Sequence, residues 1–245
     1  MRARVWPLVR KELRQMRRSR GALLSTTLLP LILLVVTPGL QLLSLREVAA
    51  QGGLRATPGL SPELFDDPQT LFARFLFPVF LILGGLIVPS VAATYTFVGE
   101  RERRSLELLL SLPLTVVDIL VAKLLAVLIL AGLVVLPLFA LDAVALLLLR
   151  VIDLNEAVQL LVVLFSALTY AVGEALLLAL LARDLRTAQN LNGALLVPVT
   201  LLAGAVLLTV PSPLQFVAVS ALLLLGALLC LTVGVRWLTF ERYLL

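Results

Sequence analysis

Long runs without a charged residue constrain this chain more than any other feature. Residues 21–45 carry no charge, and neither do the 49 residues of 187–235. About twenty apolar residues in a helix cross the hydrocarbon core of a bilayer. The chain is also 61% hydrophobic and 14% charged, whereas a soluble domain is nearer half apolar and a quarter charged. The sequence therefore predicts a polytopic membrane protein.

We expect an all-α membrane protein in which 1–245 is a single transmembrane domain with six transmembrane helices. The expected spans are 21–45, 75–98, 116–141, 157–182, 191–210 and 214–235. The last two form a hairpin, because Pro211-Ser212-Pro213 divides a run too long for one span. The apolar run 116–149 is longer than a core of about 30 Å at 1.5 Å per residue, so it projects beyond the membrane or kinks at Pro137. Residues 46–72 are predicted to form a loop with one short helix.

The first residues combine basic and apolar side chains at helical spacing. Trp6, Val9, Leu13 and Met16 share one face of a helix over 5–20, and basic residues fill the rest. Such a helix lies in the headgroup plane with its apolar face down. The alternative is a charged anchor that only precedes the first span. The same basic stretch, followed by an apolar run long enough to span, predicts that no signal peptide is cleaved here.

The distribution of basic residues predicts the topology. Six spans place both termini on one side of the membrane. Sixteen of the twenty Lys and Arg residues fall on that side: in the N-terminal segment, in 99–123, in the 183–190 loop and in the tail. The other four are Arg46, Arg55, Arg74 and Arg150. Because basic residues collect in cytoplasmic loops, we expect a multi-pass protein of the inner or plasma membrane with both termini in the cytoplasm.

The residues that usually carry chemistry are missing from the sequence. There is no histidine, and Cys230 is the single cysteine. Neither GxxxxGK[ST] nor GxGxxG occurs, so we expect no nucleotide hydrolysis by this chain. We therefore expect no catalytic residue, no bound metal and no cofactor on this chain. The net charge of +5 does not indicate nucleic-acid binding, because the basic residues sit at span ends.

A dense charge cluster at 99–113 stands between the second and third spans. Glu100 to Arg104 are five consecutive charged residues, and an amphipathic run follows until Pro113. Leu106, Leu109 and Leu110 share one helical face, so a short amphipathic helix could present charge to a soluble partner. We expect Glu100 or Glu102 near the N-terminal end of that helix, where the helix dipole favours acids. The alternative is a solvated turn whose arginines only set topology.

The residues of this cluster resemble the signature of ABC type-2 exporter permeases. In that family an acidic-basic-acidic cluster precedes Gly-Thr-Leu-Glu, a leucine pair, a proline and a Gly-Lys that opens the third span. Arg104 and Ala122 stand where the family has glycine. The segment that resembles the family's ATPase-coupling helix contains these candidate site residues: Glu100, Glu102, Arg103, Ser105, Leu106, Glu107, Leu109 and Pro113.

The resemblance implies partner subunits, with the membrane path and the ATP-binding sites on different chains. The chain would be the membrane-spanning permease of an ATP-driven exporter, paired with a second permease copy as a homodimer or heterodimer. Two separate ABC ATPase subunits would bind ATP and Mg. The start of the chain, the 186–190 loop and the tail at 240–245 are similar to the family more weakly. The sequence does not identify the substrate.

The fourth expected span, 157–182, has one acid inside it. Glu174 follows Thr169 and Tyr170 on a more polar helix face. An acid in a span is by default a functional-site hypothesis, so these three residues are candidates for a translocation path or a dimer seam. The alternative is an acid that only packs. Two other functions stay open: an ion-coupled carrier that works through Glu174 without an ATPase, and a scaffold or assembly factor.

Overall fold

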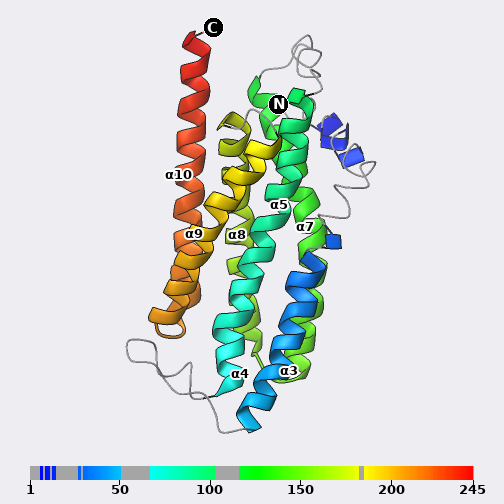
Figure 1. Cartoon of the computed structure of the whole chain (residues 1–245), viewed down its shortest axis with the longest axis vertical. Helices are drawn as coiled ribbons and strands as arrows, with labels where there is room; N and C mark the ends of the chain where they lie inside the picture. Colours follow the sequence, from blue (N-terminus) through cyan, green and yellow to red (C-terminus); the bar gives the residue numbers. More distant parts are fainter. Residues whose placement is uncertain are drawn as a thin grey trace.

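The fold is a bundle of long helices in the computed structural model (Figure 1). The structure describes residues 6–7, 9–11, 13–14, 27–28, 30–50, 67–102, 116–181 and 185–244. No strand occurs among these residues. The elements in order are η1 (Ile32–Val36), α3 (Thr37–Ala50), α4 (Pro68–Leu71), η3 (Phe72–Leu76), α5 (Phe77–Glu102), α7 (Val116–Leu148), α8 (Leu154–Leu181), α9 (Leu185–Thr209) and α10 (Leu214–Leu244).

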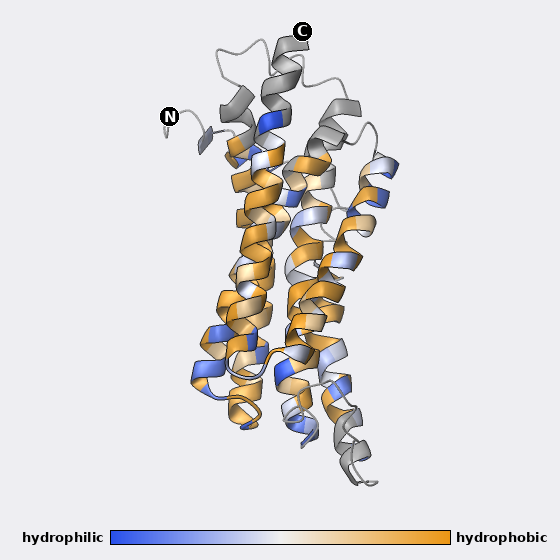
Figure 2. Cartoon of the chain, turned by 90° about the vertical axis from the view of Figure 1, so that its left-hand side faces the viewer, coloured by the Kyte–Doolittle hydropathy of each residue, from blue (hydrophilic) through white to orange (hydrophobic). Residues whose placement is uncertain are grey.

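Five stretches of described helix are long and apolar enough to cross a membrane. They are Pro68–Ala93, Val121–Leu148, Leu154–Ala175, Arg186–Thr209 and Leu214–Gly234. Hydrophobic residues cover the middle of the bundle, and hydrophilic residues gather toward its two ends (Figure 2). The expected first span at 21–45 is not confirmed, because the apolar helix described there, Ile32–Ser44, is shorter.

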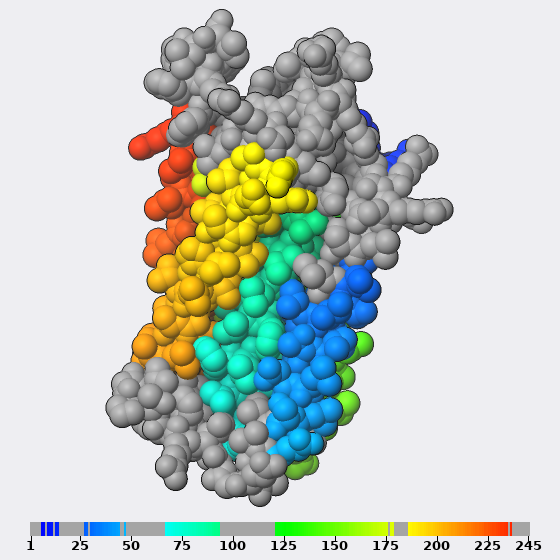
Figure 3. All heavy atoms as spheres, viewed as in Figure 1, coloured from blue at the N-terminus to red at the C-terminus, as the bar shows by residue number. Residues whose placement is uncertain are grey.

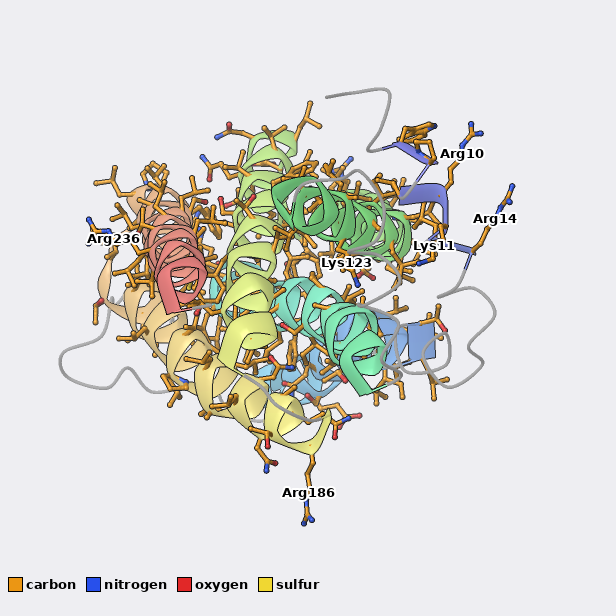
Figure 4. The ribbon with its side chains drawn as sticks, turned by 90° about the horizontal axis from the view of Figure 1, so that it is seen from above. Arg10, Lys11, Arg14, Lys123, Arg186 and Arg236 are labelled. Carbon is orange, nitrogen blue, oxygen red and sulfur yellow. The ribbon has the colours of Figure 1, made fainter. Side chains whose placement is uncertain are left out.

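The long helices alternate in direction. The C-terminal ends of α5, α8 and α10 lie at the same end of the bundle as the N-terminal ends of α7 and α9 (Figure 1). We call this the basic end, because Lys123, Arg186 and Arg236 lie near the ends of α7, α9 and α10 on this side. Figure 4 shows them, with Arg10 and Lys11, spread around the bundle as seen from above. The α7–α8 and α9–α10 turns and the start of α4 lie at the opposite end.

Helix α8 occupies the centre of the bundle. It contacts α5, α7, α9 and α10, with its broadest contacts on α10 and α5. Helix α9 lies across α5, and α5 lies beside η1 and α3 (Figure 3). One face of α8 is continuously buried, at the helical spacing of Leu160, Leu164, Ala167, Ala171 and Leu178. The candidate acid therefore lies on a helix that contacts four other long helices.

The loop predicted at 46–72 is shorter than expected. Helix α3 continues to Ala50, because residues 46–50 include neither glycine nor proline to end it. Helix α4 begins at Pro68, where proline suits the first helical turn and Asp67 is extended. Residues 51–66 lie outside the described part of the chain. Helix α7 is continuous through Pro137, and its 33 residues make it about 50 Å long.

Two short π-helical stretches each precede a proline. Thr37 donates its backbone N–H to the Ile32 carbonyl, and Pro38 follows. Phe77 donates its backbone N–H to the Phe72 carbonyl, and Pro78 follows. Proline has no N–H, and its ring clashes with the carbonyl four residues earlier. The wider π turn makes room for that ring, so both helices continue without a break.

A side chain from α10 supplies a bond that Pro78 cannot make. Pro78 cannot donate to the Arg74 carbonyl four residues earlier, and Gln215 Nε2 donates to that oxygen at 3.4 Å. Gln215 is only 1% exposed. The same Arg74 pairs through its Nε with Glu156 Oε1 at 3.3 Å. Arg74 therefore joins the start of α5 to the starts of α8 and α10.

Capping interactions define the turn between α7 and α8. Arg150 has φ 55°, and the N–H groups of Arg150 and Val151 bond back to the Leu147 and Leu146 carbonyls. This is a Schellman motif with arginine where glycine is usual. Helix α8 then starts with a capping-box contact, in which the Asp153 N–H donates to Glu156 Oε2 at 3.3 Å. One glutamate thus serves both the helix cap and the ion pair with Arg74.

Replacing Gln215 by leucine should destabilise the protein because it leaves the buried Arg74 carbonyl without its donor. We expect a loss of about 1–2 kcal/mol, measured as thermal unfolding of the full chain in detergent. In a Pro78→Ala background, residue 78 regains an N–H, so the same substitution should cost less. The matched control is Gln189→Leu, at an exposed position of α9. An equal cost in both backgrounds would contradict this role of Gln215.

Candidate functional site

The closest approach between α8 and α10 involves two glycines. A Cβ atom added to Gly173 would lie 3.1 Å from the Ala227 carbonyl oxygen. A Cβ atom added to Gly226 would lie 2.8 Å from the ring of Tyr170. Small residues on both helices therefore let the two backbones approach closely, as is common in membrane helix pairs. We call this contact the α8–α10 contact, defined by Tyr170, Gly173, Glu174, Gly226, Ala227 and Cys230.

The candidate acid Glu174 lies beside this contact, inside the chain. Its side chain is 0% exposed. Both carboxylate oxygens are buried without a hydrogen-bond partner among the described residues. Tyr170 and Cys230, which lie on the two helices of this contact, both lie near Glu174. Burying an ionised carboxylate without a partner is costly, so this acid is an unusual member of the core.

The structure separates the three residues of the candidate path. Tyr170 and Glu174 are both buried, at 5% and 0% exposure. Thr169 is exposed on another face of α8, and its hydroxyl donates to the Phe165 carbonyl at 2.7 Å. A threonine hydroxyl bonded one turn back within its own helix is a local contact. The arrangement therefore brings Tyr170 and Glu174 together and leaves Thr169 apart from them.

Two further charged residues of the membrane region are buried. Asp142 on α7 is 8% exposed, and its Oδ2 has no hydrogen-bond partner among the described residues. Lys123, also on α7, is 2% exposed and lies between helices near the basic end (Figure 4). In the part of the chain that the structure describes, no group of three or more His, Cys, Asp or Glu residues could hold a metal ion.

The predicted ATPase-coupling segment is described only at its start. Helix α5 continues through Glu100 to Glu102, so both acids belong to the last turn of a long helix. They therefore lie at a C-terminal helix end, whereas the sequence analysis expects them near the start of a separate short helix. The other coupling candidates lie outside the described residues, and they are Arg103, Ser105, Leu106, Glu107, Leu109 and Pro113. The segment lies between the basic-end termini of α5 and α7.

The N-terminal candidates take different positions. The described residues among 6–14 are helical. Val9 is 0% exposed and packs with Ala92, Ala122 and Ala175, while Leu13 is half-buried against the same cluster. Trp6 is 52% exposed. Met16 lies outside the described residues. The expected single apolar face is therefore divided, because Val9 and Leu13 pack on protein and Trp6 faces outward.

The family of the chain follows from a comparison with known proteins. Residues 6–237 match the model of a family described as ABC-2 family transporter protein. The chain belongs to this family. It is a multi-pass membrane protein and the membrane permease of an ABC transporter, and the family implies association with an ABC ATPase. The comparison with curated proteins finds no match.

Two residues of the α8–α10 contact in this ABC-2 permease were not predicted from its sequence. Gly226 and Cys230 stand in an apolar run where small residues carry no individual signal. Their spacing does carry a signal, because Gly226 and Cys230 are four residues apart and so share a helix face. Nothing in the sequence indicates that Gln215 bonds to Arg74, since the two residues are 141 positions apart.

Adding one methyl group at Gly226 should destabilise the protein, because the new Cβ atom meets the buried Tyr170 ring. We expect Gly226→Ala to cost about 1–3 kcal/mol in thermal unfolding of the full chain in detergent. The matched control is Gly193→Ala on α9, where no atom lies within 4 Å of the added Cβ. That control should be neutral or slightly stabilising, because alanine favours a helix over glycine. Equal effects of the two changes would show that the helices can separate at Gly226 without penalty.

Proposed function

We propose that this chain is the permease subunit of an ATP-driven exporter, and that separate ATPase subunits bind ATP and Mg. The observation that carries the proposal is the match of the ABC-2 transporter family to residues 6–237. Residues 1–245 contain no phosphate-binding glycine loop, and in this proposal a separate subunit supplies the energy. In this proposal the permease is not itself an enzyme, and two permease copies pair in the inner or plasma membrane.

The proposed coupling surface is at the basic end. Glu100 and Glu102 end α5, and α7 starts at Val116, so the segment between them connects two helices of the bundle. Closure of the ATPase pair on ATP would move this segment and shift the permease between two states. The distribution of basic residues supports a cytoplasmic location for this end and for both termini. A cytoplasmic location would place this end of α5 on the same side of the membrane as a soluble ATPase.

Charge reversal at the proposed coupling surface should weaken the complex with the ATPase. We expect Glu100→Lys with Glu102→Lys to reduce the amount of ATPase that copurifies from native membranes by roughly tenfold. The matched control reverses two acids at the opposite end, Glu47→Lys with Asp67→Lys, and should retain the ATPase. If the unaltered chain copurifies with no ATP-binding subunit, and the reversal leaves function intact, the exporter proposal is wrong.

The alternative is a membrane protein that works without an ATPase, as an ion-coupled carrier or as a scaffold or assembly factor. The burial of Glu174 without a hydrogen-bond partner among the described residues is the observation that favours a carrier. An unpaired acid in a membrane helix is a natural place for a transported ion to bind. In the exporter proposal the same acid would act on the substrate path from inside the bundle, because its 0% exposure in the single chain does not favour the expected dimer seam.

The substitution Glu174→Gln separates packing from function. It keeps the volume of the side chain and breaks no hydrogen bond that the structure describes, so we expect thermal stability in detergent to stay within about 1 kcal/mol. If Glu174 serves transport, export by membrane vesicles should fall while stability is kept. Normal export by this variant would remove Glu174 from the mechanism. A large loss of stability would instead show that the carboxylate has an essential packing partner.

A further inference from the structure

The N-terminal segment has a defined orientation on the bundle. Val9 is fully buried in a cluster that also contains alanines of α5, α7 and α8, and Leu13 packs against this cluster. Trp6, Arg10 and Arg14 are exposed, and positions 6, 10 and 14 follow one another at four-residue intervals along one helix face. The apolar face of the segment is therefore occupied by protein, and the face that carries the two arginines is turned outward. Figure 4 shows Arg10 and Arg14 projecting away from the bundle.

The packing partners of Val9 fix the depth of this face in the membrane. On α5, Ala93 of this cluster precedes Glu100 by seven residues. At 1.5 Å per residue, Ala93 lies about 10 Å along the helix axis from Glu100. On α7, Ala122 of the same cluster adjoins Lys123. Val9 therefore packs close to the boundary between hydrocarbon and headgroups, where interfacial helices lie.

The side chains on the outward face are of the types that bind lipid headgroups. The guanidinium of Arg10 lies over the Trp6 ring, 5.8 Å from its centroid, which is within cation–π range. Tryptophan is enriched at this depth because its ring is apolar and its N–H is polar. Arginine donates two parallel hydrogen bonds to a phosphate. The first twenty residues contain eight basic residues and one acid, so the field around this face is positive.

We propose that Trp6, Arg10 and Arg14 form a binding surface for the headgroups of anionic phospholipids at the basic end. The ring of Trp6 lies at the level of the glycerol backbone, and the guanidinium groups of Arg10 and Arg14 bind lipid phosphate. Because Val9 and Leu13 anchor the same segment on α5, α7 and α8, a bound lipid steadies the contact between the N-terminal segment and these helices. This surface is separate from the proposed ATPase-coupling surface and does not depend on that proposal.

Tryptophan quenching by brominated lipids tests the proposal on the full chain. The chain has two tryptophans, Trp6 and Trp237, so Trp237→Phe leaves Trp6 as the only reporter. The protein is reconstituted in phosphatidylcholine bilayers that contain phosphatidylglycerol, with bromine on the acyl chains of either one lipid or the other. We expect brominated phosphatidylglycerol to quench Trp6 more strongly than brominated phosphatidylcholine at equal amounts. Arg10→Gln with Arg14→Gln should reduce this preference about fivefold for each arginine.

Two controls make the outcome decisive. Arg186→Gln with Arg236→Gln removes the same charge from exposed positions on α9 and α10 and should leave the preference of Trp6 unchanged. Arg10→Lys with Arg14→Lys keeps the charge and should keep part of the preference. The proposal is overturned if Trp6 shows no preference for phosphatidylglycerol, or if both glutamine pairs reduce it equally. It is also overturned if the arginines at 10 and 14 are needed for ATPase copurification and not for the lipid preference.

Discussion

Backbone hydrogen bonding inside hydrocarbon is the constraint on which the rest of this structure depends. A bilayer core offers no water to an unpaired carbonyl, so each long helix must satisfy its own backbone. Pro38 and Pro78 interrupt that pattern, and a π turn before each one makes room for the ring. At Pro78 the donor comes from Gln215 on α10. A local defect in α5 thus becomes a link between helices that are far apart in the sequence.

Helix α8 is the central packing element of the bundle. Its packing against α10 differs from its packing against α5. Toward α10 its glycine and tyrosine fit against Gly226 and Ala227, and toward α5 it presents a continuous buried stripe. Glu174 lies where these two faces meet, with no hydrogen-bond partner in the described part of the chain. An ABC-2 permease must move its helices to transport a substrate. Movement of the helices around a buried acid would change its electrostatic energy strongly, because the dielectric constant inside the bundle is low.

The basic end collects the parts that meet the cytoplasmic side in our proposal. Helix α5 ends there with Glu100 and Glu102, and the N-terminal segment packs there through Val9. Both parts contact or continue the same helices, α5 and α7. Binding of the ATPase and binding of lipid would therefore both act on the basic-end termini of α5 and α7. The opposite end is held by the Arg74–Glu156 pair and by the cap of α8.

The sequence by itself determined the class of protein and the approximate positions of most spans. Uncharged runs and the Pro211-Ser212-Pro213 break are local features, and the end of α9 at Thr209 and the start of α10 at Leu214 lie on either side of that break. Only the tertiary structure decided which faces of the helices are buried, because in a span almost every residue is apolar and periodicity loses its contrast. Sequence reasoning grouped Thr169 with Glu174 and Trp6 with Val9, whereas packing turned one member of each pair outward. The contacts of Gln215 with Arg74 and of Gly226 with Tyr170 depend on helix rotation and closeness, and the local sequence encodes neither.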